Sequence, residues 1–169
     1  MALPPLHLDA QEMCQTLLRI DTTNPPGNEL PLAQHLASLL AQEGLEAQIL
    51  QSAPERANLV VRLRGDGSQR PLLLISHLDV VPAEPTRWTH PPFAGEVAEG
   101  QVWGRGAVDS KLTTTAQLQV LLLILAHRDA RSAVEQDVRR LQHRVGEEPG
   151  VERVGVLLRL GLELGLTRE

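Results

Sequence analysis

Apolar residues recur at every third or fourth position in two early stretches of the chain, a pattern typical of amphipathic helices. The first stretch covers residues 10–20 and follows Asp9, whose side chain can cap a helix N-terminus. The turn-forming tract 21–29 contains adjacent prolines and a glycine, which end that helix. The second stretch covers residues 29–43, and Gly44 after it favours a helix end. We therefore predict that two helices open the fold.

Short apolar segments follow the two helices and predict β-strands. We expect strands over residues 47–50, 57–63 and 71–76. The last of these is apolar at almost every position, which is typical of a strand buried on both faces. A further short strand over 101–103 leads into a turn, and we expect a helix from about residue 109 to 126. Helices before and after a mostly buried sheet predict an α/β layered domain.

The composition changes in the last part of the chain. Residues 126–169 hold 8 of the 16 basic residues, all of them arginine, and none of the aromatic residues. The length of 169 residues suits one domain. We therefore predict a domain over residues 1–125, followed by a divergent arginine-rich tail over residues 126–169.

Charge and composition exclude several classes of protein. The net charge is −5 and no cluster of basic residues is present, which argues against a nucleic-acid surface. The apolar run 120–126 is too short to span a bilayer, and the N-terminus shows no secretory signal. The single cysteine, Cys14, lies within an apolar helical pattern and is expected to be a buried thiol in a reducing compartment. We expect a cytoplasmic protein that binds neither nucleic acid nor membranes.

His77 and Asp79 follow the predicted strand 71–76 and form the first candidate site. On an extended backbone, residues two apart project to the same side, so the two side chains can meet. An imidazole that binds a metal through one nitrogen commonly donates its other N–H to a carboxylate. The alternative is a solvated pair in a loop, which is the usual fate of an isolated His-x-Asp. The remaining five histidines show no ligand spacing with this pair and are expected at the surface or in loops.

Asp109 stands in a glycine-flanked turn between the predicted strand 101–103 and the following helix. Its carboxylate can cap the helix, or its two oxygens can bridge two divalent ions, and both roles can hold at once. The turn contains Gly104-x-Gly106 without the third glycine of a dinucleotide fingerprint, so we do not expect nucleotide binding.

The segments that hold these residues resemble a known family. Three blocks carry the resemblance in the same order and at similar spacing, LLRIDTTNPPGNE, SHLDVVPAEPTRWTHPPFAGEV and GQVWGRGAVDSK, and the similarity covers about residues 9–125. The chain is similar to the zinc aminoacylase/carboxypeptidase family of metallohydrolases. That family includes acetylornithine deacetylase, succinyl-diaminopimelate desuccinylase, aminoacylase and glutamate carboxypeptidase.

The resemblance implies a partial zinc-peptidase-like catalytic domain with helices packed on a mixed sheet. It makes His77 a ligand of one zinc and Asp109 the carboxylate that bridges both zincs. Asp79, which orients His77, counts as a catalytic residue. The implied cofactor is Zn²⁺, as one or two ions, and Co²⁺ or Mn²⁺ also suits histidine and carboxylate ligands. Two neighbouring positions depart from the family pattern, Ser110 where methionine is usual and Leu112 where a small residue is usual.

The family's paired glutamates, a general base and a zinc ligand, have one candidate match here. Glu147 and Glu148 are adjacent and begin 38 residues after Asp109. A charged tract precedes them instead of the apolar strand of the family, and such a tract does not suit a central strand. The pair is therefore either the catalytic pair or a solvated charge pair.

Complete family members are more than twice as long as this chain. Their later zinc ligands and their inserted lid domain, used for dimerisation, have no place here, so the chain resembles a truncated member of unknown oligomeric state. The implied activity is amide hydrolysis on N-acyl amino acids or small peptides. The alternatives are a non-catalytic α/β binding module or gene fragment that keeps half of the ancestral domain, and a chain that does not fold stably.

Overall fold

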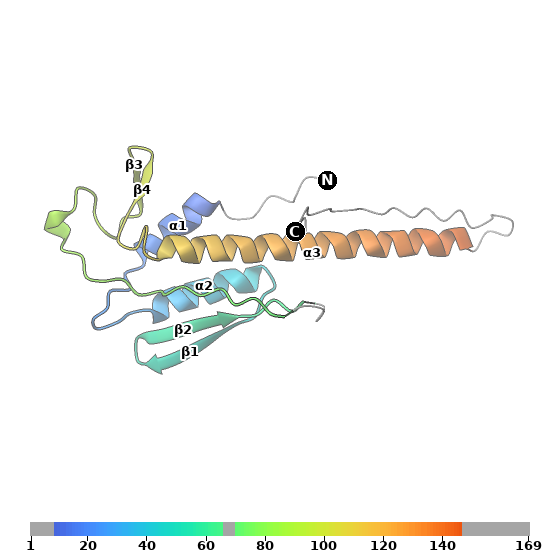
Figure 1. Ribbon diagram of the computed structural model, residues 1–169, viewed down its shortest axis with the longest axis horizontal. Coiled ribbons are helices and arrows are strands. Elements are labelled where there is room, and N and C mark those ends of the chain that lie inside the picture. Colours follow the sequence, from blue (N-terminus) through green and yellow to red (C-terminus); the bar gives the residue numbers. More distant parts are fainter. Residues whose placement is uncertain (1–8, 66–69, 147–169) are drawn as a thin grey trace, which may run out of the picture. The chain divides into compact units, whose positions relative to one another are not determined.

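The computed structural model describes residues 9–65 and 70–146 (Figure 1). Contacts divide the chain into two units, Met1–Arg128 and Asp129–Glu169. The predicted boundary between residues 125 and 126 rests on composition and stays a prediction. Glu147 and Glu148 lie outside the described residues. No helix in the described ranges is long and apolar enough to cross a membrane.

The helices and strands of the described residues follow the predicted order except that the strand over residues 71–76 is absent and β3 is additional. Both opening helices and the first two strands after them are confirmed, and the helix expected over residues 109–126 begins later and is longer. The elements are α1 (Ala10–Arg19), α2 (Leu30–Gln42), β1 (Ala47–Ala53), β2 (Arg56–Val61), the 3₁₀ turn η1 (Pro85–Arg87), β3 (Glu96–Ala98), β4 (Gln101–Trp103) and α3 (Lys111–Gly146).

Helix α1 begins and ends where the sequence pattern places it. Asp9 is its N-cap, and the side chain accepts a hydrogen bond of 2.7 Å from the backbone N–H of Gln11. The apolar face that the spacing predicts is buried, with Met13 and Leu17 almost fully enclosed. Cys14 is also buried, as predicted, and burial raises the pKa of its thiol.

The core of the first unit lies between α1, α2 and the first turns of α3. Leucine side chains dominate it because the chain has few aromatic residues to fill the space. Hairpin β1–β2 packs beside α2, and its partly buried residues Leu59 and Val61 contact the core. The buried members are Met13, Leu17, Leu32, Leu36, Leu39, Leu40, Leu45, Leu118, Leu122 and Leu125.

The strands of the described residues form two separate antiparallel hairpins, β1–β2 and β3–β4. In the first, Ala47 faces Val61 and Gln51 faces Ala57. Thr23 and Val80 form an isolated parallel bridge that joins the loop after α1 to the segment before η1. The α/β class is thus confirmed, with small sheets in place of one broad sheet.

The expected strand over residues 71–76 is corrected by the structure. The segment has no strand partner among the described residues, and Leu72, Leu73, Leu74 and Ile75 are 82%, 77%, 45% and 75% exposed. A strand buried on both faces needs neighbouring strands and covering helices, and neither hairpin pairs with this segment. The sequence pattern of a central strand is therefore present without the sheet that would bury it.

Lys111, the single lysine of the chain, is buried at the start of α3 with 1% of its surface exposed. Its Nζ donates hydrogen bonds of 2.8 Å to the carbonyl of Leu17 and 2.6 Å to that of Ile20, at the C-terminal end of α1. Burial lowers the pKa of the Lys111 ammonium from 10.5 to about 8, and the charge of Asp21 opposes this change. The ammonium thus donates to two carbonyls at the C-terminal end of α1, where that of Leu17 also accepts a 3.4 Å hydrogen bond from the backbone N–H of Ile20.

The lowered pKa of Lys111 makes stability dependent on pH. Between about pH 8 and about pH 10.5 the unfolded state binds more protons than the folded state, so the free energy of unfolding rises with pH in this window. Relative to a Lys111→Met variant, we expect the wild type to gain about 2 kcal/mol between roughly pH 7.5 and pH 10. Urea unfolding of both metal-free proteins at the two pH values measures it. A wild-type-to-variant difference that does not change with pH would contradict the prediction.

Candidate metal centre

Hydrogen bonds to the loop after α1 hold the segment that carries His77 and Asp79. The Thr22 hydroxyl donates to the carbonyl of Leu78 over 2.7 Å. The backbone N–H of Val80 donates to the Thr22 carbonyl over 3.1 Å, and that of Asn24 donates to the Val80 carbonyl over 2.8 Å. Val80 is itself buried. The backbone on both sides of Asp79 is therefore fixed to the rest of the unit.

The turn before α3 places Asp109 opposite this segment. Gly106 has a φ of +93°, and a Cβ atom built there would lie 2.8 Å from Cγ1 of Val80, so the turn requires glycine. The Ser110 hydroxyl donates to the carbonyl of His77 over 2.7 Å. Asp109 and His77 thus come from segments that contact each other directly.

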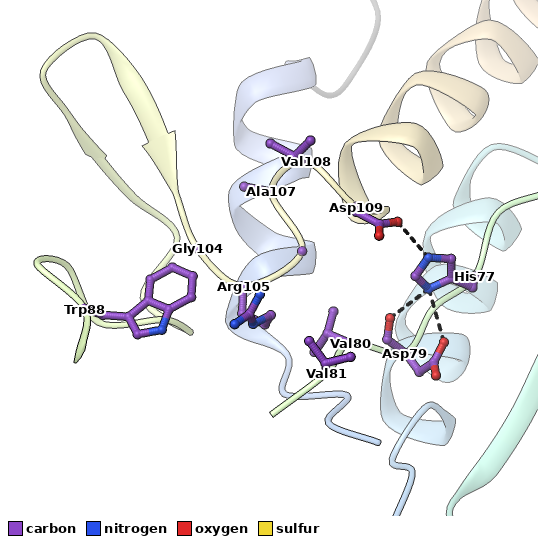
Figure 2. A pocket seen from close by; sticks show the side chains of 11 residues that line it. His77, Asp79, Val80, Val81, Trp88, Gly104, Arg105, Ala107, Val108 and Asp109 are labelled. Atoms are coloured by element: carbon purple, nitrogen blue, oxygen red, sulfur yellow. Dashed lines mark hydrogen bonds and ion pairs between the residues drawn. The ribbon is translucent and has the colours of Figure 1, made fainter. Parts of the chain in front are cut away.

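The structure brings the three predicted residues together, with His77 between two carboxylates (Figure 2). The Nδ1 atom of His77 lies 3.1 Å from Oδ1 of Asp79 and 2.9 Å from the Asp79 carbonyl oxygen. Its Nε2 atom lies 2.9 Å from Oδ1 of Asp109. The prediction that His77 and Asp79 can meet is therefore confirmed as geometry.

The carboxylates change the protonation of the ring. The hydrogen bond to Asp109 raises the pKa of His77, Asp79 adds to this, and partial burial opposes it. The amide of Asn24 donates to Oδ2 of Asp79 over 2.8 Å, and this bond, followed by the charge of His77, lowers the pKa of Asp79. Asp79 is therefore held as an anion with both oxygens engaged, one by Asn24 and one by His77.

The donor set suits a divalent metal such as zinc, which binds imidazole nitrogen and carboxylate oxygen. Nδ1 of His77 is engaged by Asp79, so Nε2 remains to face Asp109. The candidate metal ligands are therefore Nε2 of His77 and Oδ1 of Asp109. The side chains of His77 and Asp109 are 51% and 86% exposed, which leaves room for further ligands. Within residues 9–65 and 70–146, no group of three or more histidine, cysteine, aspartate or glutamate side chains could hold a metal.

A cavity of about 310 Å³ opens beside these donors. Besides His77 and Asp109, its wall includes Trp88 and Arg105 (Figure 2). Trp88 directly follows η1, and Arg105 lies in the turn after β4. Our sequence analysis did not single out either residue, nor Asn24. All three lie within the quoted sequence blocks, but only the fold shows that they reach the site.

His90 lies in the loop between η1 and β3, as expected, and its side chain is largely packed. Its ring contacts that of Trp103, with 4.6 Å between the centroids, and its Nδ1 lies 3.1 Å from Oε2 of Glu96. Its Nε2 is buried and has no hydrogen-bond partner among the described residues. His90 is therefore packed against hairpin β3–β4, and it is not among the residues that line the cavity.

Known proteins similar to this chain are peptidases and desuccinylases. Residues 73–135 match the model of peptidase family M20/M25/M40. A probable succinyl-diaminopimelate desuccinylase of Staphylococcus epidermidis is 32% identical over 142 residues, 83% of this chain and 33% of the relative. The succinyl-diaminopimelate desuccinylase of Methylobacterium sp. is 38% identical over 121 residues, 69% of this chain and 30% of the relative. The chain thus spans about a third of the length of these curated relatives.

A solved structure supports the fold. The crystal structure of an M20 family metallo-carboxypeptidase from Sulfolobus solfataricus matches with a TM-score of 0.58 and 22% sequence identity, over 74% of this chain and 28% of that chain. This likeness agrees with the α/β class of the first unit. The sequence matches thus show a peptidase family M20/M25/M40 domain within the chain and homology to desuccinylases, and the chain fits the N-terminal part of such proteins.

Proposed function

We propose that this chain carries part of the centre of a metal-dependent amide hydrolase that acts on N-acyl amino acids or small peptides. The observation that supports it is the placement of His77 between Asp79 and Asp109, with one ring nitrogen directed at each carboxylate. A structural ion pair would need only one of the two carboxylates. Two carboxylates on one imidazole, beside an open cavity, match the arrangement in which a histidine binds a metal and a carboxylate orients the ring.

Each of the three residues has a separate role in the proposal. Nε2 of His77 and the carboxylate of Asp109 hold the metal, Zn²⁺ as one or two ions, with Co²⁺ or Mn²⁺ as substitutes. Asp79 fixes the tautomer and orientation of His77, and Asn24 fixes Asp79. A bound zinc ion supplies a water of lowered pKa and polarises the amide carbonyl. Glu147 remains the candidate general base, with Glu148 as the candidate further ligand.

The described residues supply only part of such a centre. Catalytic zinc normally has three protein ligands and an open position, and His77 and Asp109 supply two. We therefore propose that these residues by themselves bind metal weakly and support slow turnover or none. This agrees with the finding that the chain spans about a third of the length of its relatives.

Metal binding can be measured directly. We expect Zn²⁺ to bind to the wild type in isothermal titration calorimetry, and His77→Ala or Asp109→Ala to abolish that binding because each removes one of two ligands. Asp79→Asn keeps both ligands and loses the orienting charge, so its affinity should fall about 10- to 100-fold. The affinity should also fall as the pH drops below the raised pKa of His77, since protons compete for Nε2.

A histidine away from the site gives the matched control. His127 is exposed on α3 and does not line the cavity, so His127→Ala should bind zinc as the wild type does. Equal zinc affinity in the wild type and in both ligand variants would contradict the proposed centre.

Hydrolysis tests the incompleteness of the centre. The zinc-loaded chain, assayed on N-acetyl amino acids and dipeptides, should release product no faster than its Asp109→Ala variant, because a third ligand is missing from the described residues. Faster release by the wild type would show a complete site. Loss of that activity in Glu147→Gln would then assign the general base.

A second candidate function is a non-catalytic module that associates through residues 72–75. The exposure of four consecutive large apolar side chains favours it, because soluble proteins rarely leave such a segment uncovered and an unpaired extended segment can accept another strand.

Association of the purified chain tests this candidate. Sedimentation velocity should show self-association that Leu73→Lys reduces, since a charge on the exposed segment opposes strand pairing. Leu50→Lys, at a partly exposed position on β1, is the control and should behave as the wild type does. A wild type that stays monomeric at all concentrations would contradict this second function.

A further inference from the structure

Arg105 is held in the cavity wall by uncharged groups. Its backbone N–H donates to the Pro92 carbonyl over 2.7 Å, and its Nη2 reaches the Pro82 carbonyl at 3.5 Å. The guanidinium carbon lies 4.9 Å from the centroid of the Trp88 ring. These contacts fix the direction of the guanidinium and leave its positive charge uncompensated.

Within the described part of the chain, Arg105 forms no ion pair with a carboxylate. The four ion pairs found there involve Arg56, His77 and His90 as the basic partners. The Nε atom of Arg105 is buried and has no hydrogen-bond partner in the same residues. A partly buried cation that has an unpaired donor and no carboxylate partner is costly, and residues of this kind commonly bind an anion of a ligand.

The position of Arg105 specifies what that anion could be attached to. Figure 2 shows Arg105 between Trp88 and the His77–Asp79 pair, on the wall of one cavity. A ligand in this cavity meets a cation on one side and the metal-binding atoms of His77 and Asp109 on the other. The cavity volume of about 310 Å³ is at the lower end of the range for small-molecule sites, so a compact ligand fits best.

We propose that Arg105, stacked on Trp88, forms a carboxylate-binding subsite that positions an anionic N-acyl amino acid with its amide toward His77 and Asp109. This inference rests on the proposed function, which supplies the amide bond that the ligand contains. The planar guanidinium can bind a carboxylate through parallel hydrogen bonds, which lysine cannot do. The subsite would select amides that carry a carboxylate over neutral amides. A metal held by His77 and Asp109 would lower the electrostatic repulsion between that carboxylate and the side chains of Asp79 and Asp109.

The fluorescence of Trp88 reports on the subsite. The chain has two tryptophans, so Trp103→Phe leaves Trp88 as the single emitter. N-acetylglycine carries its carboxylate on the amino-acid side of the amide, succinamate carries it on the acyl side, and N-acetylglycinamide is neutral. We expect a saturable change of Trp88 emission with one or both carboxylates, and none with the neutral compound. The tighter of the two carboxylates tells which side of the amide faces Arg105.

Variants of Arg105 separate the subsite from general charge effects. In the same background, Arg105→Gln should weaken carboxylate binding by about tenfold or more, and Arg105→Lys should restore part of it because the charge remains and the planar fork is lost. Arg87→Gln, at an exposed arginine beside Trp88, should change nothing. The indole N–H signal of Trp88 in the wild-type chain gives the same affinities by NMR if the Trp103→Phe variant unfolds.

Two outcomes would overturn the inference, and they differ from failure of the proposed function. Equal carboxylate affinity in the wild type and Arg105→Gln would overturn it, as would equal binding of the neutral amide. Calorimetry with Zn²⁺ tests the metal centre independently, and Arg105→Gln should bind zinc as the wild type does. A chain that binds carboxylates through Arg105 and no zinc would keep the subsite while contradicting the hydrolase.

Discussion

The hydrogen bonds between the loop after α1 and residues 78–80 position the candidate site. Thr22 holds the backbone at Leu78 and Val80, and Asn24 holds both Val80 and the Asp79 carboxylate. The segment that carries His77 belongs to no sheet among the described residues, so these contacts, together with the hydrogen bond from Ser110 to the His77 carbonyl, fix its place. The close fit of Gly106 against Val80 then brings Asp109 to the same point. The arrangement that we propose to bind a metal is thus obtained from loops held by backbone and side-chain hydrogen bonds.

The sequence predicts the local elements of this chain well because their causes are local. The Asp9 cap, the apolar face of α1 and the glycine after α2 all depend on residues a few positions apart. The meeting of His77 with Asp79 follows in the same way from residues two apart. The approach of Asp109 was indicated only by resemblance, because it depends on packing between segments 32 residues apart in sequence.

The misprediction over residues 71–76 has a different cause. An apolar run shows what environment a segment requires, and it does not show whether the rest of the fold provides it. Here Leu72 to Ile75 remain exposed beside a site whose donors are also exposed. Arg105 and Trp88 could not be inferred from spacing either, since their shared cavity wall depends on how the turn after β4 folds back on η1. Both features are properties of tertiary structure.

The burial of Lys111 makes the chain suitable for chemical labelling. Amine-reactive reagents require an uncharged, accessible amine, and this chain offers only its N-terminal amine and one lysine side chain. In the folded state, burial lowers the pKa of the amine and the packing of α1 on α3 denies reagents access to it. The rate at which Lys111 reacts therefore measures how often these two helices separate. A single native residue can thus report on local opening between α1 and α3 without any introduced probe.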